Sequence, residues 1–359
     1  MTVERRPTRR SRPKKRMRRR VLVLMHESLV PPDSIKGLSD KELAPLKSEF
    51  DVTSTLRELG HEVLPLGVDS DLGVLRRAME EFNPQITFNL LEEFHGVAVY
   101  DQHVVSYLEL MKRRYTGCNP RGLMLAHDKA LSKQVLTFHR IPVPEFAVFP
   151  MDRVFRRPPK RLGFPLLVKS LTAEGSVGIA RASLVHDEKQ LRERTEFVHR
   201  QLGTDAIAER YIEGRELYVG VWGNRRLETL PIWEMRFTVN PDDGPLIATE
   251  KVKWDREYQK KKGIVYGAAE DLPDATREAI LRMCKRTYKV LNLSGYARVD
   301  LRLTADGRIF VLEANPNPDL SYGGEFAESA ESAGFSYPGV LERVLQLGFS
   351  YRAQWQTGA

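Results

Sequence analysis

This 359-residue chain has few cysteines and no long apolar run, and these two absences exclude several classes of protein. Two cysteines, Cys118 and Cys284, are too few for a disulfide-based scaffold or a zinc site built from cysteines. The longest apolar runs, such as residues 21–25, are shorter than the ~20 residues of a transmembrane helix or the ~7–15 of a secretory signal core. With 42% hydrophobic and 29% charged residues, the composition predicts a folded cytoplasmic protein of two or three domains.

Excess positive charge is confined to the first twenty residues. They contain eleven Arg or Lys and a single acid, Glu4, whereas the rest of the chain carries 45 basic and 47 acidic side chains. Such a block of like charge with few apolar residues predicts a disordered tail. The tail could contact nucleic acid or an anionic membrane through phosphate groups, or it could simply be a solubilising extension.

The first third of the body alternates strand and helix patterns. Expected strands cover residues 21–25, 62–66 and 86–90, and expected helices cover 52–59, 72–82 and 97–111. This alternation predicts a doubly wound parallel sheet. The first strand is followed by His26-Glu27-Ser28-Leu29 rather than by a glycine fingerprint, so a dinucleotide site is not expected there.

The middle of the chain is less regular. Strands are expected at 166–170, 179–182, 206–211 and 216–222, helices at 128–138, 188–201 and 275–291, and a long polar loop at 238–263. The sequence holds no internal repeat.

A hairpin near the end of the chain carries the clearest chemical signal. Apolar and charged residues alternate over 297–303, Asp306-Gly307 is a strong two-residue turn signal, and 309–315 forms the returning strand. A two-residue turn makes partner numbers sum to 613. Asp300 then faces Glu313 and Arg298 faces Asn315 on one surface of the sheet.

Two carboxylates directly opposite each other lie ~4.5–5.5 Å apart at Cβ and repel. A bound cation reverses that cost, and Asp, Glu and Asn oxygens are the hard ligands that magnesium takes together with phosphate and water. The alternative is that Arg298 and Arg302 neutralise the acids in an ordinary surface ladder.

A glycine-containing loop, Glu174-Gly-Ser-Val-Gly178, lies between two expected strands. Its glycines allow close backbone approach, and successive N–H groups can bind an anion, although most such loops are plain turns. Lys169 precedes the loop at the end of an apolar run, where a phosphate would supply its counter-charge. The P-loop pattern is absent.

These features together resemble a known superfamily. The series runs Lys129, Lys169, the 174–178 loop, Glu209, Glu216, Arg298, Asp300, Glu313 and Asn315, and is followed by Leu312-Glu-Ala-Asn-Pro-Asn-Pro318 and Ala333-Gly334. In order and spacing it resembles the ATP-grasp superfamily, and within it most closely the D-alanine–D-alanine ligase group, over roughly residues 21–348. The resemblance implies a doubly wound α/β N-terminal domain followed by two α/β lobes that clasp ATP. The expected boundaries are 1–20 for the tail, 21–120 for the N-terminal domain, 121–205 for the small lobe and 206–350 for the C-terminal lobe.

The resemblance also implies nucleotide-binding roles. Lys129 and Lys169 would contact the phosphates, and Glu174, Gly175, Ser176, Val177 and Gly178 would close over the β- and γ-phosphates. Glu209 would accept from the adenine amino group, Tyr211 and Ile212 would present backbone to the adenine edge, and Glu216 would bind the ribose. Glu209 could instead lie on an exposed strand edge.

Catalytic and metal-binding roles follow from the same likeness. Lys251 or Lys253 would reach the γ-phosphate, although either could be plain solvated charge in a lysine-rich loop. Asp300, Glu313 and Asn315 would hold two magnesium ions, and Arg298 would stabilise the transferring phosphoryl group.

The expected substrate residues are where the chain departs from the group. The ligases place a glycine and then a serine after the Asn-x-x-Pro segment, and the serine binds the second substrate's carboxylate. Asp319 and Gly324 stand there in this chain, with Ser321 as the nearest hydroxyl. We therefore expect poor use of a second substrate with a free α-carboxylate. Glu27 could hold a substrate ammonium, and His95 lies after the third strand, near the expected substrate pocket.

The expected function is an ATP-dependent carboxylate–amine ligase that forms an amide through an acyl phosphate. It would use ATP and Mg²⁺, act on small carboxylates and amines, have no membrane span, contact nucleic acid only through its tail, and could form a homodimer. The alternative is a nucleotide-binding regulatory protein without turnover, docked on nucleic acid by the basic tail.

Overall fold

The computed structural model describes residues 18–37, 39–155, 157–160, 162–237, 247, 249, 252 and 256–357. Most of the expected basic tail, residues 1–17, lies outside them. The last part of that tail is ordered: Arg20 begins the first strand, and the Arg19 guanidinium carbon lies 4.1 Å from the centre of the Phe349 ring.

The N-terminal domain contains a three-stranded parallel sheet in the order β2-β1-β3. Its strands are β1 (Arg20–His26), β2 (Glu62–Val68) and β3 (Ile86–Asn89). Its helices are α1 (Asp40–Leu43), α2 (Lys47–Glu58), α3 (Leu72–Glu81) and α4 (Asp101–Leu110). The chain leaves β1 for a neighbour on one side and then crosses to the other side, which is the expected doubly wound arrangement.

Two helices link this domain to a small lobe: α5 (Pro120–His127) and α6 (Lys129–Phe138). Asp128 separates them and caps α6, because its side chain accepts from the backbone N–H groups of Ala130 and Leu131. The helix α5 has no counterpart in the expected elements. Its start is marked by Asn119-Pro120, a cap residue followed by proline at the first helical position.

The small lobe is a four-stranded antiparallel sheet in the order β4-β7-β5-β6, backed by a helix. Its elements are β4 (Phe146–Phe149), β5 (Leu166–Ser170), β6 (Leu184–Val185), α7 (Glu188–Phe197) and β7 (Ala206–Arg210). The expected lobe boundary at 205/206 falls just before β7, which pairs with both β4 and β5.

The C-terminal lobe is built on a six-stranded antiparallel sheet in the order β11-β10-β8-β12-β13, with β9 paired to β8. Its strands are β8 (Arg215–Trp222), β9 (Glu228–Thr229), β10 (Trp233–Phe237), β11 (Ile264–Ala268), β12 (Tyr296–Leu303) and β13 (Ile309–Pro316). Its helices are α9 (Arg256–Lys262), α10 (Asp274–Val290), α11 (Glu325–Ser332), α12 (Tyr337–Ser350) and α13 (Gln354–Thr357).

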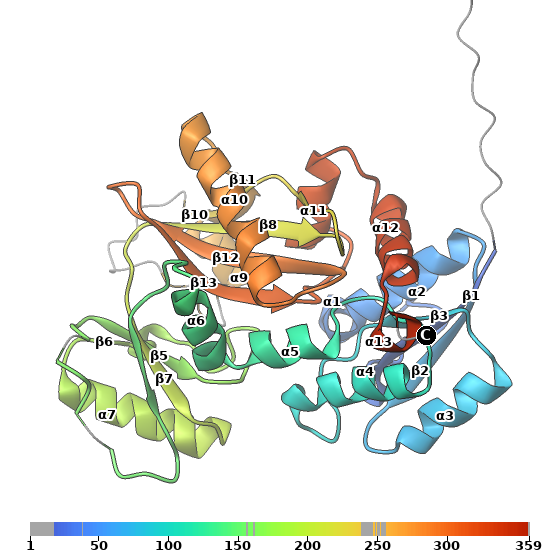
Figure 1. The fold of residues 1–359 in the computed structure, drawn as a ribbon, viewed down its shortest axis with the longest axis horizontal. Helices are drawn as coiled ribbons and strands as arrows, with labels where there is room; N and C mark the ends of the chain where they lie inside the picture. The colour runs from blue at the N-terminus through green and yellow to red at the C-terminus, as the bar shows by residue number, and fades with distance from the viewer. Residues whose placement is uncertain are drawn as a thin grey trace, which may run out of the picture.

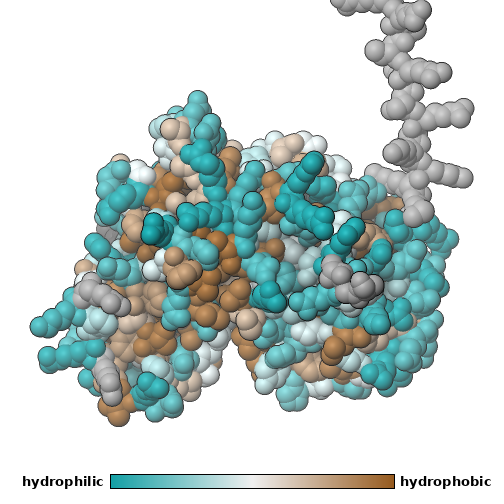
Figure 2. Space-filling model, in the orientation of Figure 1, coloured by the Kyte–Doolittle hydropathy of each residue, from teal (hydrophilic) through white to brown (hydrophobic). Residues whose placement is uncertain are grey.

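Figure 1 shows the small lobe and the N-terminal domain on either side of the helices α5 and α6, with the six-stranded sheet above them. The helix α12 returns the end of the chain to the N-terminal domain, where it packs against α2 and β3. A continuous apolar core joins the N-terminal domain to the six-stranded sheet, because the buried Leu301 of β12 and Leu22 of β1 belong to one cluster, whereas the small lobe has an apolar cluster of its own. Figure 2 shows the outline notched between the small lobe and the N-terminal domain.

Two expectations about local structure are wrong. The strand expected at 179–182 is absent, and the two-residue β6 follows it instead. The cause is the preceding loop, where Gly175, Ser176 and Gly178 all have positive φ and Ile179 donates a turn hydrogen bond to Ser176. The polar segment 238–263 contains α9 at its end, and residues 238–246 within it lie outside the described residues.

No helix within the described ranges has both the length and the apolar composition that crossing a membrane requires.

Candidate functional site

A partly open pocket lies between the small-lobe sheet and the six-stranded sheet, and the space between its walls is about 870 Å³ when the part filled by open solvent is counted. Its walls bring together many of the residues singled out from the sequence: Lys129, Lys169, Glu174, Gly175, Ser176, Val177, Glu209, Tyr211, Ile212, Glu216, Asp300, Glu313 and Asn315. Apolar Leu167, Pro144, Ile179, Ile247 and Leu312 also line the pocket, together with Ser170, Ala173, Arg210 and Arg302. Charged groups therefore converge on a space with apolar walls, the usual composition of a small-molecule site.

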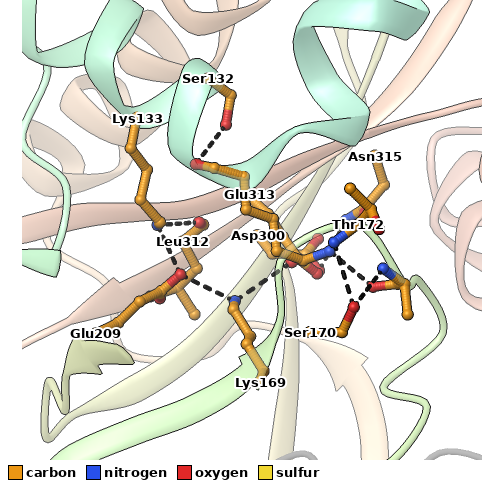
Figure 3. A network of polar contacts seen from close by, with 12 residues as sticks. Ser132, Lys133, Lys169, Ser170, Thr172, Glu209, Asp300, Leu312, Glu313 and Asn315 are labelled. Carbon is orange, nitrogen blue, oxygen red and sulfur yellow. Dashed lines mark hydrogen bonds and ion pairs between the residues drawn. The ribbon is translucent and has the colours of Figure 1, made fainter. Parts of the chain in front are cut away.

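Lys169 joins the two sheets electrostatically. It leaves β5 with its Nζ 3.3 Å from Glu209 Oε1 on β7 and 3.6 Å from Glu313 Oε2 on β13 (Figure 3). Burial opposes its charge, but the two carboxylates outweigh burial and raise the pKa of Lys169 above its ordinary value. Lys169 is thus a fixed cation inside the pocket.

Lys133 is a site residue that the sequence reasoning missed. It is buried on α6, donates to the Leu312 backbone oxygen at 2.6 Å and lies 3.4 Å from Glu209 Oε1 (Figure 3). Burial lowers its pKa to about 8, although Glu209 acts in the opposite direction. The available signal was its spacing: Lys133 stands four residues after Lys129, on the same face of the helix. Glu209 is correspondingly buried rather than on an exposed edge.

The β12–β13 hairpin has the predicted pairs at the site. Asp300 faces Glu313 and Arg298 faces Asn315. Arg298 binds Asp300 in a bidentate manner: its Nε donates to Asp300 Oδ1 at 2.8 Å and its Nη2 to Asp300 Oδ2 at 2.9 Å. Its Nη1 donates to Glu325 at 3.0 Å. Burial opposes the charge of Arg298, but Asp300 and Glu325 raise its pKa well above the ordinary value.

The donor set at the hairpin fits a hard cation. Asp300, Glu313 and Asn315 carry oxygen atoms at neighbouring positions of paired strands, and Asn315 Nδ2 donates to Asp300 Oδ2 at 3.0 Å, which leaves the Asn315 amide oxygen for a ligand. Within the described ranges, no cluster of three or more His, Cys, Asp or Glu side chains has metal-binding geometry. Any ion here would therefore rest on two carboxylates, one amide oxygen and ligand oxygens, which is the pattern of magnesium sites.

Arg302 has a carboxylate partner outside the hairpin. It reaches across to β8, where it donates to Glu216 Oε2 at 2.5 Å, while Tyr218 donates to Glu216 Oε1 at 2.8 Å. Glu216 therefore keeps a fixed orientation at the pocket wall.

The 174–178 loop covers one side of the pocket. Val177 donates to the Glu174 backbone oxygen and Ile179 to that of Ser176, and Ser170 Oγ accepts from the Thr172 and Ala173 amides (Figure 3). Lys129 Nζ donates to the Ala173 oxygen at 2.7 Å. The Gly178 oxygen, at the other end, accepts from Arg194.

The expected substrate residues do not line this pocket. The exposed Glu27 follows β1, and the exposed His95 follows β3 with its amide donating to the Asp69 oxygen after β2. Both therefore lie at the carboxyl edge of the N-terminal sheet, where ligands of open α/β sheets bind. Asp319, Ser321 and Gly324 lie in the turn before α11.

Ser321 is already engaged in this turn. Its backbone N–H donates to Asp319 Oδ1 at 3.0 Å and its hydroxyl to Asp319 Oδ2 at 2.5 Å. A Cβ on Gly324 would lie 2.8 Å from Ser321 Oγ. Asp319 is exposed, and its charge points to a negative potential at this side of the cleft.

Two further carboxyl groups, those of Glu49 and Glu92, interact with Asp319, and their raised pKa values leave each only partly ionised near pH 7. Burial and the nearby Asp319 raise the pKa of Glu49, on α2, to about 7. Glu92 is solvent-exposed, yet the surrounding protein and the carboxylates of Glu174, Glu49 and Asp319 raise its pKa to about 7. Lys251 and Lys253, the expected γ-phosphate lysines, lie outside the described residues.

Comparison with known proteins agrees with this arrangement. Residues 135–346 match the family model described as the D-ala D-ala ligase C-terminus. The chain is 32% identical to the uncharacterized protein y4sG of Sinorhizobium fredii, over 82% of this chain and 85% of that protein. It is 30% identical to a D-alanine–D-alanine ligase of Desulforudis audaxviator, over 87% of this chain and 95% of the relative.

Solved structures show the same fold. A D-alanine–D-alanine ligase from Bacillus anthracis, complexed with ATP, has a TM-score of 0.71 at 21% identity and covers 92% of this chain and 97% of its own. The VanG D-Ala:D-Ser ligase from Enterococcus faecalis has a TM-score of 0.66 at 17% identity, over 92% of this chain and 100% of its own. The expected ATP-grasp fold class is thereby confirmed. The chain belongs to the D-alanine–D-alanine ligase family of ATP-dependent carbon–nitrogen ligases.

Proposed function

We propose that this protein couples ATP cleavage to amide formation between a small carboxylate and an amine. The observation that carries the proposal is the convergence of Lys129, Lys169, Asp300, Glu313 and Asn315 on one pocket. Fixed cations and oxygen ligands at one point suit a triphosphate, because phosphoryl transfer is catalysed mainly by positioning and charge neutralisation.

The reaction has two balanced steps. A substrate carboxylate oxygen attacks the γ-phosphorus, the bond to the ADP oxygen breaks, and an acyl phosphate forms. The amine nitrogen then attacks the acyl carbon, inorganic phosphate leaves, and the amine loses a proton. Lys169 and Lys129 would hold phosphate oxygens, and Arg298, fixed on β12, would stabilise the transferring group.

The remaining nucleotide groups have matching partners. Glu209, together with the backbone at Tyr211 and Ile212, would bind adenine, and Glu216 would accept from the ribose hydroxyls. Magnesium would be held by Asp300, Glu313 and Asn315, where it would neutralise phosphate charge.

We propose that the second substrate is an amine without an α-carboxylate. The exposed Asp319 makes this side of the cleft negative, Glu49 and Glu92 add partial charge near pH 7, and the Ser321 hydroxyl donates to Asp319. A bound carboxylate without donors costs at least ~1–3 kcal/mol. D-alanine should therefore be a poor second substrate, while a cationic amine would gain from the same charges.

We further propose that the protein is cytoplasmic, that it forms a homodimer and that its basic tail contacts nucleic acid. Cys118 and Cys284 are buried and free, which suits a reducing compartment.

The test is ADP release by the purified chain with ATP, magnesium and a panel of amino acids and amines. ADP formation that requires both a carboxylate and an amine, with one amide formed per ADP, supports the ligase. Nucleotide binding without turnover for the whole panel would favour the regulatory alternative.

A further inference from the structure

His127 occupies an unusual place beside the nucleotide pocket. It is the last residue of α5, is buried, and contacts two carboxylates from different elements. Its Nε2 lies 3.3 Å from Asp101 Oδ2, at the start of α4, and its Nδ1 lies 3.5 Å from Glu174 Oε1, at the start of the glycine loop. One imidazole therefore links the N-terminal domain to the loop.

The charge of this imidazole is settled by its neighbours. Burial disfavours the cation, but Asp101 and Glu174 outweigh it, with Lys129 of α6 opposing them, and the pKa of His127 rises to about 9. The protonated state therefore stabilises the folded protein. That contribution is complete below the unfolded pKa of ~6.5 and disappears as the pH rises through about 9.

The contact between His127 and Glu174 bears on ligand binding, because Glu174 belongs to the pocket loop. It is the acid of a loop that lines the pocket, about one-third of its side chain is exposed, and a triphosphate in the pocket would repel it. A cation paired with Glu174 removes that repulsion and holds the loop's first residue, as Lys129 holds Ala173.

We propose that His127 is a positioning residue for the nucleotide loop: its imidazolium anchors Glu174 to Asp101 and cancels the loop's negative charge beside the phosphates. The second half of this assignment rests on the proposed function. The first half, the anchoring, does not depend on any ligand.

Hydrogen exchange tests the anchor in the protein without nucleotide. At pH 7, His127→Gln should speed exchange at the Val177 and Ile179 amides about tenfold or more, which corresponds to ~1.4 kcal/mol. Glu174→Gln breaks the same contact from the more exposed side and should do likewise, so the test survives if His127→Gln does not fold. His186→Gln, on an exposed histidine of the same lobe, is the matched control. Unchanged loop exchange in Glu174→Gln would overturn the anchor.

ATP titration tests the charge cancellation. His127→Gln should weaken ATP binding about tenfold or more, and adding Glu174→Gln should restore most of that loss, because the repelling charge is then gone. A merely structural histidine would give no such rescue. Wild-type affinity should also fall as the pH rises through 9, and the double variant should show a smaller decline, because Lys133, with a pKa of about 8, still titrates in it.

The two failures are distinguishable. If the wild-type chain binds no ATP, the proposed function is wrong, while the exchange data still decide the anchor. If ATP binds but His127→Gln binds it as tightly as wild type, or if Glu174→Gln gives no rescue, the charge-cancelling role of His127 is wrong.

Discussion

Replacing Glu313 by Gln is the sharpest test of the hairpin. The change removes one of the two facing carboxylates and the contact from Glu313 Oε2 to Lys169 Nζ at 3.6 Å. At an effective dielectric constant of ~20, that contact is worth at most about 4–5 kcal/mol. Lys169 keeps Glu209 at 3.3 Å and Glu313 is partly solvated, so we expect unfolding to become easier by only about 1–2 kcal/mol.

Catalysis should suffer far more than stability. Losing one preorganised charge at a phosphoryl-transfer site costs about 100-fold or more in rate, or ~2.7 kcal/mol of barrier. The assay is ADP release at increasing magnesium concentrations, where the variant should also need about tenfold more magnesium for half its maximal rate. Asp306→Asn, at the exposed tip of the same hairpin, should leave the rate unchanged. Near wild-type ADP release by Glu313→Gln would refute the reasoning.

Asp300→Asn is a less clean test than the sequence alone indicates. From the sequence, relief of like-charge repulsion should leave the fold intact. In the structure, however, the buried Asp300 accepts two hydrogen bonds from the partly buried Arg298. Removing one partner of a buried pair costs about 3–5 kcal/mol, so lost activity in this variant could reflect unfolding.

Three further outcomes are expected. Deleting residues 2–17 should leave ADP release within about twofold of wild type and abolish salt-sensitive binding to heparin, since this segment carries the excess positive charge; a large fall in rate would show that the tail takes part in turnover. Gly324→Ser should raise the rate with D-alanine as both substrates about tenfold, because it supplies a hydroxyl donor; its φ of −78° allows a side chain, and the Ser321 and Asp319 side chains, 2.8 and 2.9 Å from the new Cβ, must shift to admit it. An unchanged rate would contradict the specificity argument. Lys133→Met should raise the KM for ATP about tenfold with little change in kcat, because Lys133 orients Glu209; an unchanged KM would show that it only packs the core.

The hairpin shows how a correct prediction can rest on an incomplete reason. A two-residue turn at Asp306-Gly307 implies partner sums of 613, but near the turn Leu303 pairs with Ile309, a sum of 612. The loop is one residue longer than expected, and a bulge between Asp300 and Leu301 restores the predicted register at the site. Alternation along a strand does not reveal a bulge in its partner, so the sequence could not show this compensation.

Other parts of the site depend on long-range contacts that no local pattern encodes. The strand order β4-β7-β5-β6 brings Glu209 and Lys169 onto neighbouring strands, and only that arrangement gives Lys133 its carboxylate. The alternation along β12 places Arg302 on the same face as Asp300. It does not identify the partner of Arg302, because that partner, Glu216, lies on β8, 86 residues earlier in the chain. Residue types and chain order were predictable from the sequence, whereas the choice of ion-pair partners was decided by packing.

The central claim is that this chain makes an amide at the expense of ATP. It is tested most directly by incubating the purified full-length protein with ATP, magnesium, a carboxylate labelled with ¹⁸O and a panel of amines, and then measuring the label in the released phosphate. An acyl phosphate intermediate predicts one ¹⁸O atom transferred to inorganic phosphate for each amide formed, with cationic amines outperforming D-alanine. Amide formation with unlabelled phosphate would contradict the account, as would ADP release that no amine in the panel accelerates.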